Sequence, residues 1–208
     1  MTELERINIL DKILEELYPN TKCFLSYEKD YELLIAVILS AQALDKSVNK
    51  VTPVLFNKYK TLEELSNADL NDVIEIIKPV GLAKNKATNI IKTARILSEE
   101  YNNTIPKNFD ELQKLPGVGY KTAGVVMAEL YDFHIIPVDT HIFRVSNRII
   151  FNNKYNNADK ISKELTNYYS GKSYIDFHRR IILFGRNICS SRSPKCSSCP
   201  FTNICYHK

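Results

Sequence analysis

Four cysteines, Cys189, Cys196, Cys199 and Cys205, crowd one short segment of the chain. Six, two and five residues separate them in turn. Four thiolates at such short spacing are typical of a tetrahedral metal site, and zinc and iron–sulfur clusters both accept four cysteines. The spacing predicts a metal site rather than a disulfide framework, and by itself it leaves the kind of centre open.

A glycine-rich turn is the second feature with chemical potential. Gly117 and Gly119 flank Val118, and the missing Cβ atoms let another backbone come close. A helix is expected to begin directly after the turn, and the unpaired N–H groups of a helix N-terminus form a natural phosphate site. The turn predicts a grip on a nucleic-acid backbone that ignores base sequence. A tight interhelical turn that needs glycine only for its geometry explains two glycines equally well.

Helices must position these residues, because apolar residues recur at helical spacing along most of the chain. One apolar stripe runs from Leu4 to Leu17, a nearly continuous apolar segment covers Tyr31 to Gln42, and a further stripe runs from Ala87 to Leu97. Phe109 to Leu130 predicts a helical hairpin around the glycine turn. Few segments alternate with period two, so the sequence predicts an all-α fold.

The charge pattern is uneven although the net charge of +4 is modest. From Phe177 onward there are six basic residues and no acidic one, whereas the first seventeen residues carry five acidic residues against two basic ones. Two solvated faces explain this pattern best, and a basic tail that faces a polyanion is the sharper alternative. The longest apolar run, Leu33 to Leu39, is far shorter than the roughly 20 residues that a bilayer span needs. No targeting segment is recognisable, and a cytoplasmic, nucleoid-associated location is expected.

The glycine turn with Lys121, together with the segment Val138 to Arg148, resembles the endonuclease III family of helix-hairpin-helix DNA glycosylases. In that family a lysine in the second hairpin helix attacks the deoxyribose, and an aspartate before the next helix assists it. The resemblance assigns these roles to Lys121 and Asp139. Taken alone, Lys121 reads as a solvated surface lysine and Asp139 as a helix N-cap.

The chemistry of base removal explains these residue types. A carboxylate such as Asp139 can stabilise the positive character that develops on the sugar when the glycosidic bond breaks. A neutral lysine amine can form a Schiff base, and β-elimination 3′ to the abasic site can follow. The reference pKa of lysine is about 10.4, so its surroundings must depress the pKa, as helix-dipole charge and desolvation both do. The resemblance thus implies a bifunctional base-excision repair glycosylase and lyase for oxidised pyrimidines.

The same resemblance implies how the enzyme reaches a base inside duplex DNA. The target nucleotide must rotate out of the stack, and another group must fill the gap. The family pattern assigns Gln42 to the vacated position and Leu82 to a second wedge, although a core leucine is the alternative reading for Leu82. Lys84 and Lys86 would then lie close to phosphate, although a simple solvated face explains them almost equally well. The predicted DNA contacts are Gln42, Leu82, Gly117, Val118, Gly119 and His141.

The resemblance also covers the cysteines, whose spacing matches the 4Fe-4S loop of the endonuclease III family. It implies a 4Fe-4S cluster held by all four, with a structural role. The cluster would hold a compact basic loop, including Arg192 and Lys195, against the DNA backbone. Cys23 lies far from this segment and reads as a half-buried residue.

The family fold implies two all-α domains and a monomer bound to double-stranded DNA with a damaged base or abasic site. A helical barrel domain with the hairpin is expected over residues 20–131. A discontinuous iron–sulfur cluster domain is expected over residues 1–19 and 132–208. The active-site groove is expected between the two.

Three rival functions remain open at this stage. Adenine-mismatch glycosylases of the same superfamily carry a glutamate at the position of Ala36 and lack the hairpin lysine, so Ala36 and Lys121 count against that reading. A noncatalytic DNA-binding module would not need Lys121 and Asp139 together. An iron–sulfur electron carrier would need neither the glycine hairpin nor Gln42.

Overall fold

The structure is a computed structural model that describes residues 1–207, and this part of the chain consists of helices and connecting loops without any strand. The prediction of an all-α fold is confirmed. The chain divides into two compact units. The central unit is Cys23–Leu130, and the terminal unit combines Met1–Lys22 with Tyr131–Lys208.

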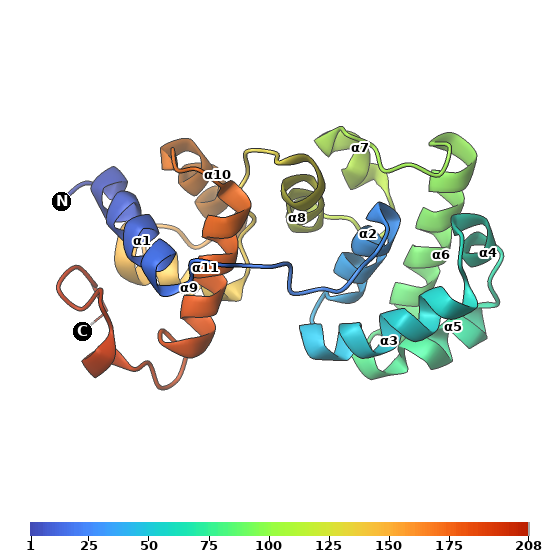
Figure 1. Cartoon of the computed structure of the whole chain (residues 1–208), viewed down its shortest axis with the longest axis horizontal. Helices are drawn as coiled ribbons and strands as arrows, with labels where there is room; N and C mark the ends of the chain where they lie inside the picture. The colour runs from blue at the N-terminus through green and yellow to red at the C-terminus, as the bar shows by residue number, and fades with distance from the viewer. Residues whose placement is uncertain (208) are drawn as a thin grey trace. The chain divides into compact units, whose positions relative to one another are not determined.

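The central unit is built around one helix that is buried on nearly all sides. The run Leu33 to Leu39 in α2 is buried throughout, as its lack of polar residues predicts. This helix contacts α3 and α6, and α6 in turn packs against α4 and α5 (Figure 1). The helices of this unit are α2 (Asp30–Leu39), α3 (Asp45–Lys58), α4 (Leu62–Ser66), α5 (Leu70–Ile77), η1 (Lys78–Val80), α6 (Ala83–Glu100), α7 (Phe109–Lys114) and α8 (Tyr120–Tyr131).

The terminal unit packs the first helix of the chain against the last segments. Leu10 and Leu14 of α1 are fully buried, and α1 contacts α10, α11 and η2. A π-helical turn, η2, continues α9 directly. The helices of this unit are α1 (Glu3–Leu17), α9 (Thr140–Ser146), η2 (Asn147–Phe151), α10 (Ala158–Tyr168), α11 (Tyr174–Asn187) and η3 (Cys196–Ser198).

Most helix starts follow the usual capping rule. Seven helices in the described residues begin at a Ser, Thr, Asn or Asp whose side chain accepts a hydrogen bond from the helix's own N–H groups. Two helices begin instead at a leucine without such a bond, α3 at Leu44 and α6 at Leu82. Both leucines are exposed, so neither packing nor capping explains them.

Part of the basic C-terminal charge is neutralised inside the terminal unit. Arg180 is buried, and its guanidinium lies 3.6 Å from Asp11 and 3.8 Å from Glu15 of α1. Arg179 pairs with Asp176 at 3.1 Å. The expected cationic tail is therefore shorter than the sequence indicates, with Arg192 and Lys195 exposed and Lys208 outside the described residues.

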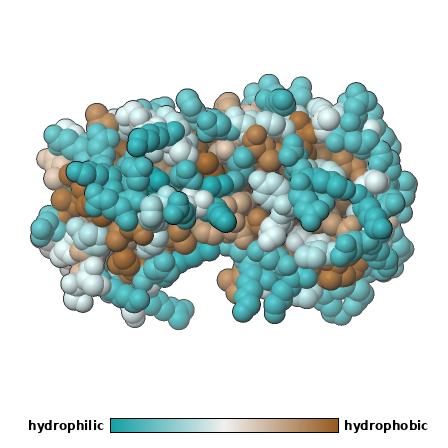
Figure 2. Space-filling model, viewed as in Figure 1, coloured by the Kyte–Doolittle hydropathy of each residue, from teal (hydrophilic) through white to brown (hydrophobic). Residues whose placement is uncertain are grey.

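The visible face of each unit is mostly hydrophilic, with hydrophobic residues showing in scattered patches (Figure 2). Within residues 1–207 no helix is long and apolar enough to cross a membrane.

Candidate functional site

The glycine turn joins α7 to α8 and fixes the geometry of the hairpin. Gly117 has φ +81°, a conformation that side chains rarely adopt. A Cβ at this position would lie 3.0 Å from Asn89 Nδ2 and 3.1 Å from Ile38 Cγ2. Gly117 is therefore required by the fold itself.

Gly119 is different, because nothing in the chain requires it. A Cβ built there would meet no atom within 4 Å, and its φ is not in the left-handed region. The first helical hydrogen bond of α8 runs from the Ala123 N–H to the Gly119 carbonyl at 2.9 Å. In the part of the chain described, the backbone N–H groups of residues 119–122 donate no hydrogen bond to another element. The open space at Gly119 and these amides suit close approach by an anion.

Val118 turns away from solvent. Its side chain is buried, and its N–H donates to the Leu115 carbonyl at 3.1 Å. Burial excludes the Val118 side chain from contact with DNA. Contact through the Val118 backbone stays a prediction.

Lys121 is the second residue of α8, one turn or less from these amides. Its side chain is exposed, and it makes no hydrogen bond or ion pair with any residue in 1–207. The ammonium is thus not held in a structural ion pair. The expected desolvation of Lys121 is not provided by the chain, so a bound ligand would have to supply it.

Asp139 is the N-cap of α9. Its backbone is extended, with φ −98° and ψ −175°, and Oδ1 accepts the Ile142 N–H at 2.8 Å. The side chain is half-buried, and Oδ2 makes no hydrogen bond within the described residues. One oxygen orients the carboxylate, and the other is available for chemistry.

Gln42 and Leu82 both occupy strained turns of the central unit. Gln42 has φ +54° and Leu82 has φ +51°, and both side chains are exposed. Every other non-glycine residue with positive φ among residues 1–207 is Asn or Asp, which tolerate this conformation better. Such strain concentrates at functional positions. The alternative of Leu82 as a core leucine is wrong, because its side chain is 56% exposed.

The prediction that Lys86 lies close to phosphate is wrong. Lys86 is only 4% exposed, and its Nζ donates to the Val80 carbonyl at 2.8 Å. Burial lowers the pKa of Lys86. Its ammonium therefore supports the turn that presents Leu82, whereas Lys84 remains exposed.

His141, on the first turn of α9, is held by neighbouring side chains. Its Nδ1 lies 3.2 Å from Arg144 Nη2, and Gly185 allows α11 to approach closely, because a Cβ there would lie 2.9 Å from the His141 Cβ. Burial lowers the pKa of His141, and the charges of Arg144 and Arg186 act in the same direction against Asp139. A neutral ring can accept the Arg144 N–H at Nδ1.

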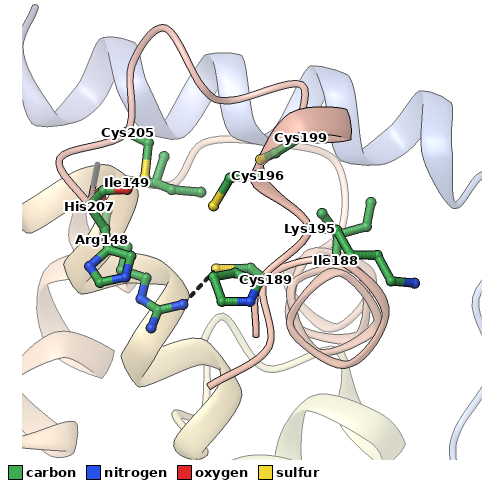
Figure 3. A pocket seen from close by; sticks show the side chains of 10 residues that line it. Arg148, Ile149, Ile188, Cys189, Lys195, Cys196, Cys199, Cys205 and His207 are labelled. Atoms are coloured by element: carbon green, nitrogen blue, oxygen red, sulfur yellow. Dashed lines mark hydrogen bonds between the residues drawn. The ribbon is translucent and has the colours of Figure 1, made fainter. Parts of the chain in front are cut away.

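The four cysteines line one cavity of the terminal unit, with their side chains directed toward a common space (Figure 3). Arg148 of η2 reaches this cavity. Its guanidinium donates to Cys189 Sγ at 3.4 Å and to the Ser190 carbonyl at 2.9 Å. Its own carbonyl accepts the Tyr206 N–H at 2.8 Å. Sequence reasoning missed Arg148, because it lies some 40 residues before the loop that it holds.

The thiols have the electrostatics of a shared site. Burial raises the pKa of Cys199 and of Cys205, and the charges of the other cysteines in the segment raise both further. A cationic centre would be needed to keep all four as thiolates. Within residues 1–207, however, no three or more His, Cys, Asp or Glu side chains stand close enough together to hold a metal ion as placed.

A larger cavity, of about 560 Å³, lies in the central unit between residues 26–32 and the C-terminal half of α3. None of the predicted site residues lines it. This cavity is therefore separate from the predicted site residues.

Comparison with known proteins accounts for the hairpin and the residues around it. The family model described as "HhH-GPD superfamily base excision DNA repair protein" matches residues 35–170. Endonuclease III of Bacillus subtilis (strain 168) is 39% identical over 206 residues, which cover 99% of this chain and 94% of that protein. The chain belongs to the endonuclease III family.

Two solved structures agree with this family assignment. They are described as a non-covalent endonuclease III–DNA complex and a trapped endonuclease III–DNA covalent intermediate. Each has a TM-score of 0.92 and 39% identity, and covers 99% of this chain and 96% of that one. As a member of the endonuclease III family, the chain is a base-excision repair enzyme, a DNA glycosylase and lyase. The predicted family and enzyme class are confirmed.

Proposed function

We propose that this endonuclease III family member removes oxidised pyrimidines from duplex DNA and then cleaves the strand, with Lys121 as nucleophile and Asp139 as its partner. The observation that carries the proposal is the environment of Lys121. An unpaired lysine follows a helix N-terminus whose glycine, Gly119, the chain itself does not need. Both features suit a phosphate backbone that brings a sugar to the amine.

Lys121 takes part in both steps of the reaction, the release of the base and the cleavage of the strand. The neutral Lys121 amine attacks C1′ of the damaged nucleotide, the bond from C1′ to the base breaks, and the base leaves with a proton. That proton comes from the amine, and the second amine proton passes to O4′ as the sugar ring opens, which gives an imine between Nζ and C1′. Removal of a proton from C2′ then breaks the C3′–O3′ bond, and the 3′ phosphate departs. Water hydrolyses the imine and releases Lys121.

Asp139 stabilises the positive charge that develops on the sugar as the base leaves. Its Oδ1 is fixed by the Ile142 N–H, so Oδ2 is the oxygen assigned to the sugar. His141 lies two residues further along, and we assign it to the DNA backbone from the same helix.

DNA would be held by the α8 amides at Gly119 and by two side chains that enter the stack. Gln42 would occupy the position of the flipped nucleotide, and Leu82 would separate neighbouring bases. Their left-handed backbones place both side chains in solvent before any ligand arrives. Both similar endonuclease III structures are complexes with DNA, which supports this partner. We propose that the enzyme acts as a monomer.

We also propose that Cys189, Cys196, Cys199 and Cys205 hold a 4Fe-4S cluster. A single zinc ion needs four sulfurs at about 2.3 Å, whereas a cluster core is larger and accepts thiolates that stand further apart. Four thiols that line one cavity without forming a tight mononuclear set favour the cluster. When bound, it would cross-link residues 189–205 through iron–sulfur bonds. The two compact units would then be the barrel domain and the cluster domain.

Borohydride trapping tests the proposed chemistry, because reduction converts the imine into a stable protein–DNA adduct. The substrate is a duplex with one oxidised pyrimidine. We expect an adduct with the native chain and none with Lys121→Gln. Lys114→Gln, which removes another exposed lysine of the hairpin, is the matched control and should trap like the native chain.

Two results would contradict the proposal. Trapping by Lys121→Gln would assign the nucleophile to another amine. Activity confined to a duplex with adenine opposite oxidised guanine, and absent with oxidised pyrimidines, would favour the adenine-mismatch alternative.

A further inference from the structure

Leu44 is the most exposed of the large hydrophobic residues described, with 76% of its surface accessible to solvent. It stands between the Gln42 turn and α3, and its carbonyl accepts the Ser47 N–H at 2.8 Å and the Val48 N–H at 3.1 Å. Its backbone is therefore fixed while its side chain lies in water. An isolated exposed leucine is ordinary, so exposure alone does not indicate a function for Leu44. Its position in the helix gives the additional evidence.

That place is unusual, because Leu44 is the N-cap of α3. Ser, Thr, Asn and Asp are favoured there, since their side chains accept an amide hydrogen bond that leucine cannot. Seven other helices of the described chain have such a cap, and α3 has none. The leucine thus costs helix stability and exposes apolar surface at once. The other leucine with both properties is Leu82, the proposed wedge.

The surroundings of Leu44 indicate what it meets. Gln42 lies two residues before it in the same turn, which the Ala43 N–H closes by donating to the Ser40 carbonyl at 3.0 Å. Lys46 and Lys50 follow on α3, four residues apart and so on one face. Both are exposed, and neither forms an ion pair in the described chain. An apolar side chain flanked by a base-sized amide and free cations matches the groove of a duplex better than a protein surface.

We propose that Leu44 is a further lesion-contact residue, which packs against the sugar and base edge beside the gap that Gln42 fills. The inference rests on the proposed function of Gln42. It assigns to the Gln42 turn two side chains with different tasks. The glutamine forms hydrogen bonds with the unpaired base, and the leucine excludes water from the distorted step next to it.

The test is equilibrium binding of the full-length protein to two duplexes that differ at one position. One carries a tetrahydrofuran abasic-site analogue, which cannot form an imine, and the other is intact. Leu44→Thr should bind the analogue duplex about tenfold more weakly, as expected for partial burial of one leucine. Binding to the intact duplex should be unchanged, because no gap forms there.

Two further readouts separate this contact from a structural effect. Threonine can cap α3, so the melting temperature of Leu44→Thr should rise by about 2–4 °C while lesion affinity falls. The slope of affinity against salt concentration should stay the same, since no phosphate contact is lost, whereas Lys46→Gln should reduce that slope by about one counterion.

Matched variants complete the design. Val54→Thr removes another exposed apolar side chain from α3, 54% exposed and near the far end of the helix, and should bind both duplexes like the native chain. Leu44→Met keeps an apolar side chain and should recover most of the affinity for the analogue duplex.

Each outcome is decisive. Unchanged affinity of Leu44→Thr for the analogue duplex would overturn the role of Leu44 and leave the proposed function intact. Equal loss on both duplexes would also overturn it, because the contact would not depend on the gap. Failure of the native chain to prefer the analogue duplex would overturn the proposed DNA contacts and the Leu44 inference together.

Discussion

Single residues show how one side chain can serve both the fold and the reaction. Asp139 caps α9 through Oδ1 and leaves Oδ2 without a hydrogen-bond partner in the described residues. The helix therefore orients the carboxylate that the proposed reaction uses. Capping and catalysis can be separated, because they depend on different properties of the carboxylate.

Asp139→Asn should separate these two roles. Asparagine is an equally good N-cap, so stability and duplex binding should be retained, whereas turnover should fall on the order of a hundredfold with the loss of charge. Thermal melts, duplex affinity and single-turnover base release on an oxidised pyrimidine provide the three measurements.

Asp139→Ala is the companion variant. It should lose the same turnover and also about 1 kcal/mol of stability, because the Ile142 N–H loses its acceptor. Equal melting temperatures for the two variants would show that the cap contributes nothing, and full turnover by Asp139→Asn would remove the carboxylate from the mechanism.

The residue scale also shows what sequence patterns can and cannot predict. The family pattern assigned Gln42 and Leu82 to the DNA stack, and their exposed side chains are compatible with that assignment, which stays a prediction. The predicted phosphate contact of Lys86 is wrong, because a charged residue on a helix is expected to face water. Here the Lys86 ammonium is buried and donates a hydrogen bond to the Val80 carbonyl. Only the three-dimensional path of the turn reveals that acceptor.

At the scale of elements, the hairpin uses its two glycines for different purposes. Gly117 allows a left-handed backbone in close contact with Asn89 and Ile38, so it belongs to the fold. Gly119 lies in open space at the start of α8, so we assign its lack of a side chain to the close approach of the proposed DNA ligand. Periodicity predicted the hairpin and its two helices, but identical residues two positions apart could not be told apart from sequence.

Replacement of each glycine by alanine tests this division. Gly117→Ala should destabilise the protein by at least about 1 kcal/mol, because its backbone is left-handed and its Cβ would crowd Asn89. Gly119→Ala should keep native stability and bind duplex DNA more weakly. Denaturant unfolding and duplex affinity measure the two effects, and the reverse pattern would contradict the assignment.

At the scale of the whole molecule, the two ends of the chain are joined within the terminal unit. Arg6 of α1 donates to the carbonyls of Ile149 and Ile204, and its guanidinium lies 4.1 Å from the centre of the Tyr206 ring. Arg148 holds the start of the cysteine loop through the Ser190 and Ser191 carbonyls, and its own carbonyl accepts the Tyr206 N–H near the end of the loop. Protein contacts thus fix the edges of this loop, and the proposed cluster would fix its middle.

Loss of a cysteine ligand should therefore loosen the loop without unfolding the central unit. In Cys199→Ser we expect less bound iron and rapid tryptic cleavage at Arg192 and Lys195, which are exposed. Fragments of residues 23–130 should stay resistant. Iron content, visible absorbance and mass-mapped proteolysis measure these effects.

Cys23→Ser is the control, since Cys23 lies in the other unit. It should keep native iron content and protease resistance. Native iron content in Cys199→Ser would remove Cys199 from the ligand set.

Sequence spacing predicted that the four cysteines lie together, and all four line one cavity, because residues close in sequence need little help from the fold to meet. It could not find Arg6 or Arg148, whose partners lie far along the chain. It also overestimated the cationic surface, because it could not see that Arg180 faces Asp11. Hydrogen bonds and ion pairs between residues far apart in the chain could not be predicted from sequence spacing.

The left-handed turns at Gln42 and Leu82 bear on how quickly the enzyme can search a genome. Their strain is met during folding, so no rearrangement of these two backbones is needed at each base pair encountered. If Gln42 and Leu82 are the DNA contacts proposed above, the same two turns would meet every step of the duplex as the protein slides. The protein would then pause only where a nucleotide rotates out of the stack. The ease with which a damaged base pair opens, rather than a slow conformational change in the protein, would set the rate at which lesions are found.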